Sequence, residues 1–363
     1  MINILHYIPS FQVGGIESFL LSMDKYREAD INFIYLVENE IPEEYSKIIK
    51  GYGSKIIYLS YPGYKSFFKI LKYIKSLKKI LVENKIDILH CHVWSSRPFI
   101  IPIALLSKIK IRIVHSHSKN FNSNNKYLLQ KLFTKFGVAL SNVYYGCSED
   151  ACKFAFNRRK YTVINNGIDF EKFKYNKVER EKVRAKNNIQ FNQKVYINVG
   201  RFCYLKNQVF LIDVFYEILK YDKDAILFLV GSGDDIALIN KKIEDYGIID
   251  NVIIFDSINN PASLLSAADC FIFPSISEGL GISYLEAQAA GLKCIISNGV
   301  PNIGTFSTEV IQLDLDQGPE KWASNIISFM EKKYVRKSFY SKKFDSKEIS
   351  KKYQENVRKL VNL

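Results

Sequence analysis

The sequence predicts an α/β protein with two doubly wound, Rossmann-like domains. The chain has 363 residues, which is enough for two domains of ordinary size that each bury a core. Short runs rich in Ile, Val, Tyr and Phe alternate with longer amphipathic stretches, a pattern typical of βα units in parallel sheets. The pattern stops and restarts near Lys194. Two separate parallel sheets are therefore expected.

Each half of the chain is expected to supply its own set of strands, with helical stretches between most of them. In the first half these are Ile2–Ile8, Ile31–Val37, Lys55–Ser60, Ile86–His92, Arg112–His117 and Val143–Ser148. In the second half they are Lys194–Gly200, Ala225–Val230, Val252–Asp256, Cys270–Pro274, Lys293–Ser297 and Glu309–Leu313.

The boundary between the domains is expected after the segment TVINNGIDFEKF, which gives domains 1–173 and 174–344. The stretch Lys174–Lys194 carries many charges and little hydrophobic period, which favours a linker with a flanking helix. The last segment, 345–363, has the pattern of a polar helix with one apolar stripe. We expect this helix to pack back on the first domain.

Composition excludes several classes of protein. Hydrophobic residues make up 47% and charged residues 24%, which is typical of a globular chain and not of a disordered or fibrous one. The six cysteines form no CxxC pair, so a reducing cytoplasm is the expected compartment. The N-terminus lacks the pattern of a signal peptide, and no apolar run reaches the about 18 residues that a membrane span needs.

The chain is strongly basic, with a formal net charge of +14 and a pI near 9.2. Such a balance favours an anionic partner, which could be a phosphorylated ligand, an acidic lipid surface or nucleic acid. A composition rich in Lys and Asn is the alternative explanation. No recognisable nucleic-acid-binding module accompanies the charge, so nucleic acid is not an expected partner.

The most informative segment is SEGLGISYLEAQAAGLKCIIS, where Glu278 and Glu286 are separated by seven residues. It follows a predicted strand, and ligands of open α/β sheets bind beyond the carboxyl ends of the strands. Gly279 and Gly281 would let the backbone approach phosphate or sugar oxygens at the start of a helix. Glu278 could accept hydrogen bonds from sugar hydroxyls and Glu286 from ribose hydroxyls.

The alternative for this pair is a solvated Glu278 and a Glu286 on a helix surface. Apolar neighbours such as Leu285 and Ala289 instead indicate a helix that is mostly packed in the interior. A carboxylate there is costly unless a partner satisfies it.

This segment closely resembles the mark of the retaining glycosyltransferase family 4, E-x7-E within a stretch like PSxxEGxGxxxxEAxAxGxPVI, and the resemblance covers nearly the whole chain. It implies the GT-B architecture, in which two Rossmann-like domains face each other across a cleft. The first domain would hold the acceptor. The second would hold a nucleotide-sugar donor, with contacts from Glu278, Gly279, Leu280, Gly281 and Glu286. Lys293 departs from the family pattern, where proline is common.

The resemblance also implies a function. Similar enzymes build bacterial capsular polysaccharide and exopolysaccharide from UDP-sugars. We therefore expect transfer of a hexose or N-acetylhexosamine from a UDP-sugar to a glycan or lipid-linked acceptor, with retention and without a metal or other cofactor. A nucleotide-sugar epimerase of the same fold is the main alternative, and a basic nucleic-acid-binding protein is a weaker one.

A second segment, NVGRFCYLKNQ, places Arg201 and Lys206 after a predicted strand. Two cations there could hold a diphosphate, or they could be ordinary solvated loop residues. Family members use the matching Arg and Lys on the donor. Without a metal, the charge that grows on the departing nucleotide must be stabilised by such groups and by a helix dipole. Both residues are therefore expected to be catalytic as well as donor-binding.

Glycines mark two further loops. PSFQVGGIESF carries Gly14 and Gly15 at a predicted helix start with Glu17 in its first turn, which does not match the GxGxxG dinucleotide fingerprint. In the family the matching glycines face the donor phosphates, and Glu17 is an expected acceptor contact. A helix entry that needs flexible φ is the alternative. Gly231 and Gly233 in VGSGD are expected to turn the chain near the nucleotide.

All five histidines lie in the first third of the chain, and four of them form HCH and HSH at the ends of predicted strands. Alternate strand residues share a face, so each pair could point the same way. Such clustering makes a zinc site conceivable, although no HExxH motif accompanies it. The family resemblance instead places His117 beside the donor sugar, with His90 and His92 binding acceptor or ordering the site. For each histidine a packed structural role is the alternative.

Residues 64–85 read as a basic amphipathic helix in which Lys65, Lys69, Lys72 and Lys79 can share a face. Such a helix could lie on the anionic inner face of the cell membrane. The solvated outer face of a crossover helix would show the same lysines. Membrane contact is therefore one of two expectations for this segment.

Overall fold

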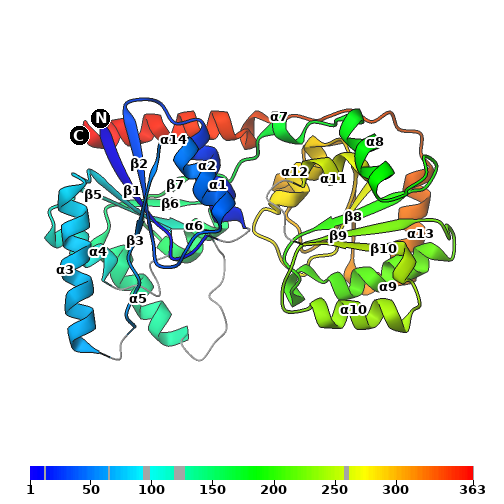
Figure 1. Ribbon diagram of the computed structural model, residues 1–363, viewed down its shortest axis with the longest axis horizontal. Coiled ribbons are helices and arrows are strands. Elements are labelled where there is room, and N and C mark those ends of the chain that lie inside the picture. Colours follow the sequence, from blue (N-terminus) through cyan, green and yellow to red (C-terminus); the bar gives the residue numbers. More distant parts are fainter. Residues whose placement is uncertain (12–13, 64–65, 93–98, 118–126, 257–260, 363) are drawn as a thin grey trace. The chain divides into compact units, whose positions relative to one another are not determined.

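The computed structural model describes residues 1–11, 14–63, 66–92, 99–117, 127–256 and 261–362, with side chains left out at 127–130 (Figure 1). The chain divides into two compact units. The first comprises Met1–Gly167 and Ser346–Leu363, and the second Ile168–Asp345. The division between Gly167 and Ile168 falls slightly before the expected boundary at 173. Each unit has its own sheet and core.

The first unit is built on a seven-stranded parallel sheet in the order β3-β2-β1-β4-β5-β6-β7. Its strands are β1 (Ile2–Tyr7), β2 (Ile31–Val37), β3 (Lys55–Tyr58), β4 (Ile88–Cys91), β5 (Ile111–Ser116), β6 (Val143–Gly146) and β7 (Thr162–Val163). The strand order reverses between β1 and β4, so the carboxyl ends of these strands are where an open α/β sheet binds ligands.

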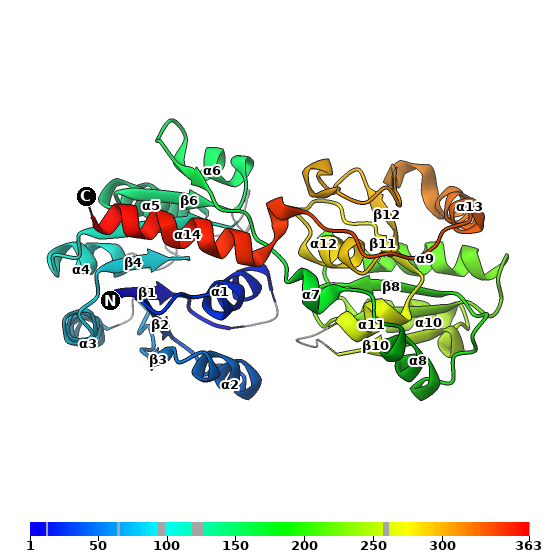
Figure 2. The same ribbon diagram turned by 90° about the horizontal axis from the view of Figure 1, so that it is seen from above.

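Helices cover both faces of this sheet. One face carries α1 (Gly15–Lys25), α2 (Glu43–Gly51) and α14 (Ser346–Val361), whose apolar side chains share one core. The other carries α3 (Phe67–Glu83), α4 (Ile100–Leu106), α5 (Tyr127–Leu140) and α6 (Glu149–Phe156). The last helix, α14, lies beside α1, as both ribbon views show (Figure 2). The expected docking of this helix on the first unit is what the structure shows.

The contacts of α14 explain its position. Its residues Ile349, Tyr353 and Val357 lie on one stripe and are buried in the core of the first unit. At its far end the guanidinium of Arg358 lies within 2.6–2.8 Å of the carboxylates of Glu28 and Asp30. An apolar stripe and a charged end therefore hold the C-terminal helix on the first unit. The whole second unit, Ile168–Asp345, lies between this helix and the rest of the first unit in the sequence.

The second unit has a six-stranded parallel sheet in the order β10-β9-β8-β11-β12-β13. Its strands are β8 (Val195–Val199), β9 (Ile226–Val230), β10 (Val252–Phe255), β11 (Cys270–Phe273), β12 (Lys293–Ser297) and β13 (Val310–Leu313). One face packs against α7 (Phe170–Phe173), α8 (Lys177–Lys186), α11 (Ala262–Ala267) and α12 (Ile282–Ala289). The other packs against α9 (Gln208–Leu219), α10 (Ile236–Asp245) and α13 (Gly318–Glu331).

The predicted fold class is confirmed, and each of the expected strands overlaps an observed one. The short edge strand β7 was missed. Two residues carry too little period to stand out from a loop.

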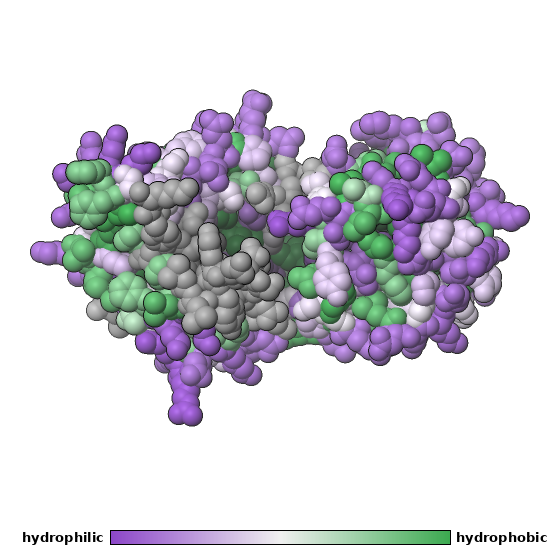
Figure 3. Space-filling model, turned by 90° about the horizontal axis from the view of Figure 1, so that it is seen from below, coloured by the Kyte–Doolittle hydropathy of each residue, from purple (hydrophilic) through white to green (hydrophobic). Residues whose placement is uncertain are grey.

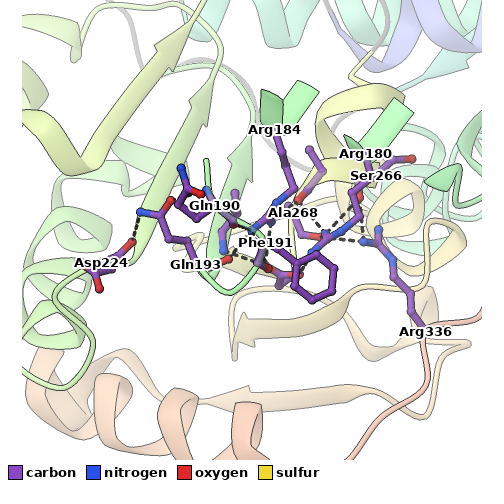
Figure 4. A network of polar contacts seen from close by, with 12 residues as sticks. Arg180, Arg184, Gln190, Phe191, Gln193, Asp224, Ser266, Ala268 and Arg336 are labelled. Carbon is purple, nitrogen blue, oxygen red and sulfur yellow. Dashed lines mark hydrogen bonds and ion pairs between the residues drawn. The ribbon is translucent and has the colours of Figure 1, made fainter. Parts of the chain in front are cut away.

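The helix expected in the stretch 174–194 is α8, but the expected linker character was wrong, because this stretch is an anchored part of the second unit (Figure 4). Arg180 and Arg184 on α8 point inward, donate to the carbonyl of Ala267 and pair with Asp269. Arg336 donates to the carbonyls of Ser266 and Ala268 from the other side. A charged stretch looks solvated in sequence, but here guanidinium groups satisfy the carbonyls at the end of α11.

Candidate functional site

The second unit places two of the predicted donor residues in direct contact. The ammonium of Lys206 lies 2.6 Å from a carboxylate oxygen of Glu278. Their side chains are 24% and 9% exposed, so the lysine neutralises a carboxylate that is almost buried. The same ammonium lies 5.0 Å from the ring centroid of Phe273, the last residue of β11. The pair therefore stands just beyond the carboxyl end of a central strand.

Backbone hydrogen bonds fix the loops that carry this pair. The amide of Glu278 donates to the carbonyl of Gly299 at 3.0 Å. The amide of Ile276 donates to the carbonyl of Leu205, the residue before Lys206, at 2.8 Å. The loop after β8 and the loop after β11 are thus tied to each other, and the two charges face each other as a consequence.

Three amide side chains that sequence reasoning missed support the same loops. Asn198 donates to the carbonyl of Ile272 at 2.7 Å, and Gln208 bridges the side chain of Asn198 and the carbonyl of Arg201. Asn207 adopts a left-handed conformation with φ of 58° and donates to the carbonyl of Pro274. A polar residue inside the apolar run VYINV was the available signal, because a buried amide needs partners.

Arg201, the other predicted phosphate-binding cation, is exposed at the start of this loop. Lys206 contacts Glu278, whereas the side chain of Arg201 lies at the surface. Its assignment to the donor diphosphate stays a prediction.

Gly231 and Gly233 are required by close packing against this loop. A Cβ at Gly231 would lie 2.0 Å from the carbonyl oxygen of Gly200, and one at Gly233 would lie 2.2 Å from that of Phe202. Both distances are far below van der Waals contact, so any larger residue would push the 200–202 segment away. The two glycines thus position the segment that contains Arg201.

Gly281 begins α12 in a left-handed conformation with φ of 75°, which favours glycine. Gly279 has open space where a side chain would stand, so a ligand could approach its backbone. Leu280 between them is buried in the core. Of the three predicted donor contacts in this loop, Leu280 could therefore contribute through its backbone alone.

Glu286 lies within α12 between the buried residues Leu285 and Ala287 and is itself partly exposed. Burial raises the pKa of its carboxyl to about 8, and the positive charge of Lys172 on α7 opposes this rise. A carboxyl with so costly a charge needs hydrogen-bond donors from elsewhere. A need for outside donors is expected of a carboxylate that accepts hydrogen bonds from the hydroxyls of a bound ligand.

The first unit gathers all five histidines at the carboxyl ends of β1, β4 and β5. His6, His90, His92 and His115 are buried, and His117 is partly exposed. Four hydrogen bonds join their rings to one another and to Tyr353 of α14: His6 Nδ1 to His92 Nε2 at 3.1 Å, His92 Nδ1 to His117 Nε2 at 2.9 Å, His90 Nε2 to His115 Nδ1 at 3.2 Å, and His90 Nδ1 to the Tyr353 hydroxyl at 2.9 Å.

These bonds decide what His90 and His92 can do. Both ring nitrogens of each residue already have a partner within the unit. Of the two roles expected for them, ordering the site is therefore favoured over direct contact with an acceptor.

Burial strongly affects the histidines. It lowers the pKa of His6 and of His117 to about 3, and it holds the pKa of the three others well below the usual range, with neighbouring imidazoles adding to the effect. All five are therefore neutral near pH 7. Nitrogens of two overlapping triplets lie within 4.8 Å of one another, His6, His90 and His92 in one and His92, His115 and His117 in the other. Neutral imidazoles at this spacing are chemically able to hold a metal ion.

The conformation of Gly14 does not match the alternative expected for the glycine loop, which was a helix entry that needs flexible φ. Gly14 precedes α1 in an extended conformation with φ of −175°, which any residue can adopt. A Cβ there would lie 2.8 Å from a carboxylate oxygen of Glu17, which is the end of a flexible side chain that can move aside, so space does not require glycine either. Glu17 is buried in the first turn of α1, and Gly15 is the first residue of that helix. The predicted contacts of these three residues with donor or acceptor stay predictions.

Family models match both units. The model described as Glycosyltransferase Family 4 matches residues 13–172, and the one described as Glycosyl transferases group 1 matches residues 179–345. Together the two matches cover most of the chain and meet close to the boundary between the units.

Several relatives align with the chain, and three of them show the range of similarity. A Bacillus subtilis protein named as glycosyltransferase EpsF is 26% identical, over 99% of this chain and 96% of its own. The capsular polysaccharide biosynthesis glycosyltransferase CapH of Staphylococcus aureus is 26% identical, over 92% of each. An Escherichia coli enzyme named UDP-Gal:α-D-GlcNAc-diphosphoundecaprenol α-1,3-galactosyltransferase is 28% identical, over 64% of this chain and 63% of its own.

The fold also matches solved structures. The crystal structure of Anabaena HepE in complex with UDP and glucose superposes with a TM-score of 0.74, covering 99% of this chain and 100% of that one, at 16% identity. At this identity the likeness shows the fold, which is the GT-B architecture. Within the described residues, no helix is both long and apolar enough to cross a bilayer.

Proposed function

Because the chain joins a glycosyltransferase family 4 region to a group 1 region in the GT-B fold, it is a glycosyltransferase, and we propose that it transfers a hexose or N-acetylhexosamine from a UDP-sugar. The acceptor is a glycan or lipid-linked saccharide in the synthesis of a surface polysaccharide. Two findings support these choices: the HepE structure contains UDP and glucose, and the Escherichia coli relative is named for a UDP-sugar and a diphosphoundecaprenol acceptor.

The contact between Lys206 and Glu278 is the observation that carries the proposal. An ammonium that we assign to the diphosphate and a carboxylate that we assign to the sugar hydroxyls lie 2.6 Å apart, just beyond the carboxyl end of β11. In the donor complex Lys206 binds the diphosphate, together with Arg201 and the backbone at the start of α12. Glu278 then accepts hydrogen bonds from the sugar, and Glu286 accepts them from the ribose.

The proposed reaction retains configuration at the anomeric carbon. A bond forms between the acceptor oxygen and this carbon while the bond from the carbon to the diphosphate oxygen breaks, and an oxygen of the departing diphosphate takes the acceptor proton. Arg201, Lys206 and the positive end of α12 stabilise the charge that the diphosphate gains. His117 of the first unit orients the donor sugar.

No divalent metal or other cofactor is needed in this scheme. The role of a metal, which is to neutralise the leaving diphosphate, falls to Arg201 and Lys206. Support comes from Lys206, whose loop is fixed by a backbone hydrogen bond to the loop that carries Glu278. Transfer that persists in excess EDTA is the expected behaviour.

A peripheral contact with the inner face of the cytoplasmic membrane is part of the proposal. At the start of α3, Phe67 and Phe68 are 69% and 82% exposed, and Lys69 and Lys72 are exposed beside them. Lys65, which was expected on the same face, lies outside the described residues. Apolar and hydrophilic residues intermix on the surface of the first unit in the view from below (Figure 3). Exposed aromatic rings beside lysines suit binding to an anionic lipid surface. A lipid-linked acceptor would be anchored in the same membrane.

A transfer assay tests the proposed function. The protein is incubated in EDTA with UDP-glucose, UDP-galactose or UDP-N-acetylglucosamine and a short-chain diphospholipid saccharide, and products are identified by mass spectrometry. We expect a glycosylated acceptor with one of these donors. Conversion of the donor to an isomeric UDP-sugar without acceptor would show an epimerase instead.

A further inference from the structure

The histidines of the first unit form two hydrogen-bonded chains that follow the register of the sheet. In the β1·β4 pairing His6 is opposite His90, yet it bonds to His92, two residues further along β4. In the β4·β5 pairing His90 is opposite Ile113, yet it bonds to His115, again two residues further. Each bond is thus a diagonal on one face of the sheet.

The first chain of bonds runs His6–His92–His117 and ends at the carboxyl edge. His92 uses Nε2 toward His6 and Nδ1 toward His117, at 3.1 and 2.9 Å. Among the described residues, His117 Nδ1 and His6 Nε2 have no hydrogen-bond partner. The chain therefore starts at one buried nitrogen and ends at another, with every nitrogen between them bonded.

Neutral imidazoles in such a chain cannot choose their tautomers independently. Each carries one N–H, and each bond between two ring nitrogens needs one N–H and one bare nitrogen. If His6 is protonated on Nδ1, then His92 must be protonated on Nδ1 and so must His117. If His117 is protonated on Nε2, the same holds for His92 and His6. The only consistent states have all three on Nδ1 or all three on Nε2.

We infer that His6 and His92 are positioning residues whose tautomers are coupled to that of His117, and so to whether its Nδ1 donates or accepts a hydrogen bond. This deepens the proposed function, because it rests on His117 as the residue that orients the donor sugar. His6 lies two strands away from His117 in the sheet order β1-β4-β5, and it acts only through His92.

The second chain has the same logic and supports the first. The hydroxyl of Tyr353, a buried residue of α14, bonds to His90 Nδ1, and His90 Nε2 bonds to His115 Nδ1. Rings of neighbouring histidines on one strand stack, with centroids 4.2 Å apart for His90 and His92 and 4.1 Å for His115 and His117. Stacking leaves the rings little freedom to turn over, which preserves the pattern of bonds.

The chain of bonds also competes with a metal. A metal ion needs the bare lone pair of each ligand nitrogen, and His92 already engages both of its nitrogens with other imidazoles. Holding an ion in either histidine triplet would break at least one of these bonds. We therefore expect the purified protein to contain no stoichiometric zinc.

The test is a measurement of tautomers by NMR in protein labelled with 15N-histidine. Two-bond correlations between ring protons and nitrogens distinguish Nδ1–H, Nε2–H and imidazolium, and single His→Gln variants assign the five rings. Near pH 7 we expect His6, His92 and His117 to be neutral and to share one tautomer. Different tautomers within this group would overturn the inference, as would about one zinc ion per chain by elemental analysis.

Variants at His6 show whether the effect is transmitted. In H6L the bond to His92 is lost while the His92–His117 bond remains, so these two rings should still share a tautomer but the populations of the two tautomers should change. In H6N a short amide can still exchange a hydrogen bond with His92 Nε2, and the populations should return toward those of the wild type. A His117 spectrum that is unchanged in H6L would contradict the inference, and the wild-type test of a shared tautomer stands if H6L fails to fold.

Kinetics separate this inference from the proposed function. In H6L we expect kcat to fall by about tenfold with KM for the UDP-sugar little changed, because a wrong tautomer impairs orientation without removing donor contacts. H6N should recover most of the rate. If H117A transfers sugar as fast as the wild type, His117 does not orient the donor sugar. The tautomer coupling would still stand if the wild type and the His6 variants give the expected NMR spectra.

Discussion

The ammonium of Lys206 and the carboxylate of Glu278 lie 2.6 Å apart although 72 residues separate them in the chain. Each is expected to bind a different part of the donor. In the free protein they neutralise each other, which reduces the cost of an almost buried carboxylate. A diphosphate that attracts Lys206 would release Glu278 for the sugar, so the pair would link recognition of the two parts of the donor.

Removal of Lys206 should therefore affect more than one contact. In K206A we expect kcat/KM to fall by a factor that corresponds to about 2–4 kcal/mol, because the diphosphate loses a cation and Glu278 is left unpaired. K321A, which removes an exposed lysine on α13, is the matched control. Steady-state kinetics with the preferred UDP-sugar measure both, and equal rates for K206A and K321A would remove Lys206 from the mechanism.

Donor binding should depend on pH through Glu286. Burial raises the pKa of this carboxyl to about 8, so it is mostly protonated near pH 7 in the free protein. If it binds the ribose hydroxyls as a carboxylate, affinity for a UDP-sugar should rise by roughly tenfold per pH unit below pH 8 and level off above it.

Calorimetric titration of a UDP-sugar from about pH 6 to 9 measures this dependence, since the diester-linked diphosphate of the donor does not titrate in that range. The variant E286Q cannot ionise, so its affinity should be lower and should not vary with pH. A flat profile in the wild type would show that Glu286 is not required as a carboxylate.

The first unit should lose stability in acid. Burial holds the pKa of His6 and His117 at about 3, below the ordinary 6.5, so between these values the unfolded chain binds more protons than the folded one. Stability is then complete above about pH 6.5 and falls as the pH is lowered, by about 1.4 kcal/mol per pH unit for each such histidine.

Hydrogen exchange followed by mass spectrometry gives the opening free energy of β1, β4 and β5 separately from that of the second unit. Between about pH 6.5 and 5 these strands should lose protection faster than β8 and β11, whose unit contains no histidine. H6N should lower the slope by one proton. An equal loss in both units would point to a cause other than the histidines.

Substitution of Gly231 or Gly233 should disturb the donor site from a distance. An added Cβ would meet the carbonyl oxygen of Gly200 or Phe202 at 2.0 or 2.2 Å and displace the segment that holds Arg201. We expect G231A and G233A to lose about 1–3 kcal/mol of stability and to bind UDP more weakly. In G51A a Cβ has open space and no left-handed φ, so it should behave as wild type. Thermal unfolding with and without UDP provides both quantities, and unchanged UDP binding in G233A would separate this loop from the donor.

Membrane contact should depend on the start of α3. Replacement of both Phe67 and Phe68 by serine should reduce cosedimentation with vesicles that contain anionic lipid by about tenfold, because two exposed rings lose their place in the interface. F191S is the matched control, since Phe191 in the second unit is 95% exposed. Added salt should weaken binding of the wild type. Equal binding by both variants would rule out α3 as the contact.

Much of the fold could be predicted because its signals are local. Runs of β-branched and aromatic residues, with turns between them, indicated the twelve longer strands without any tertiary information. The E-x7-E segment likewise placed Glu278 at a strand end and Glu286 inside a helix, since both positions follow from sequence spacing. By contrast, Arg180 and Arg184 looked solvated, because their partners Ala267 and Asp269 lie far along the chain.

The sequence by itself determined that this protein has two parallel α/β sheets, because hydrophobic period encodes them, and that its second half carries an E-x7-E segment that resembles the glycosyltransferase family 4 motif. Only the tertiary structure decided which side chains meet. The Lys206–Glu278 pair depends on loops of adjacent strands being bonded to each other, and the His6–His92–His117 chain depends on the register of β1, β4 and β5. Register and long-range pairing arise from packing of the whole unit, so a linear pattern cannot contain them.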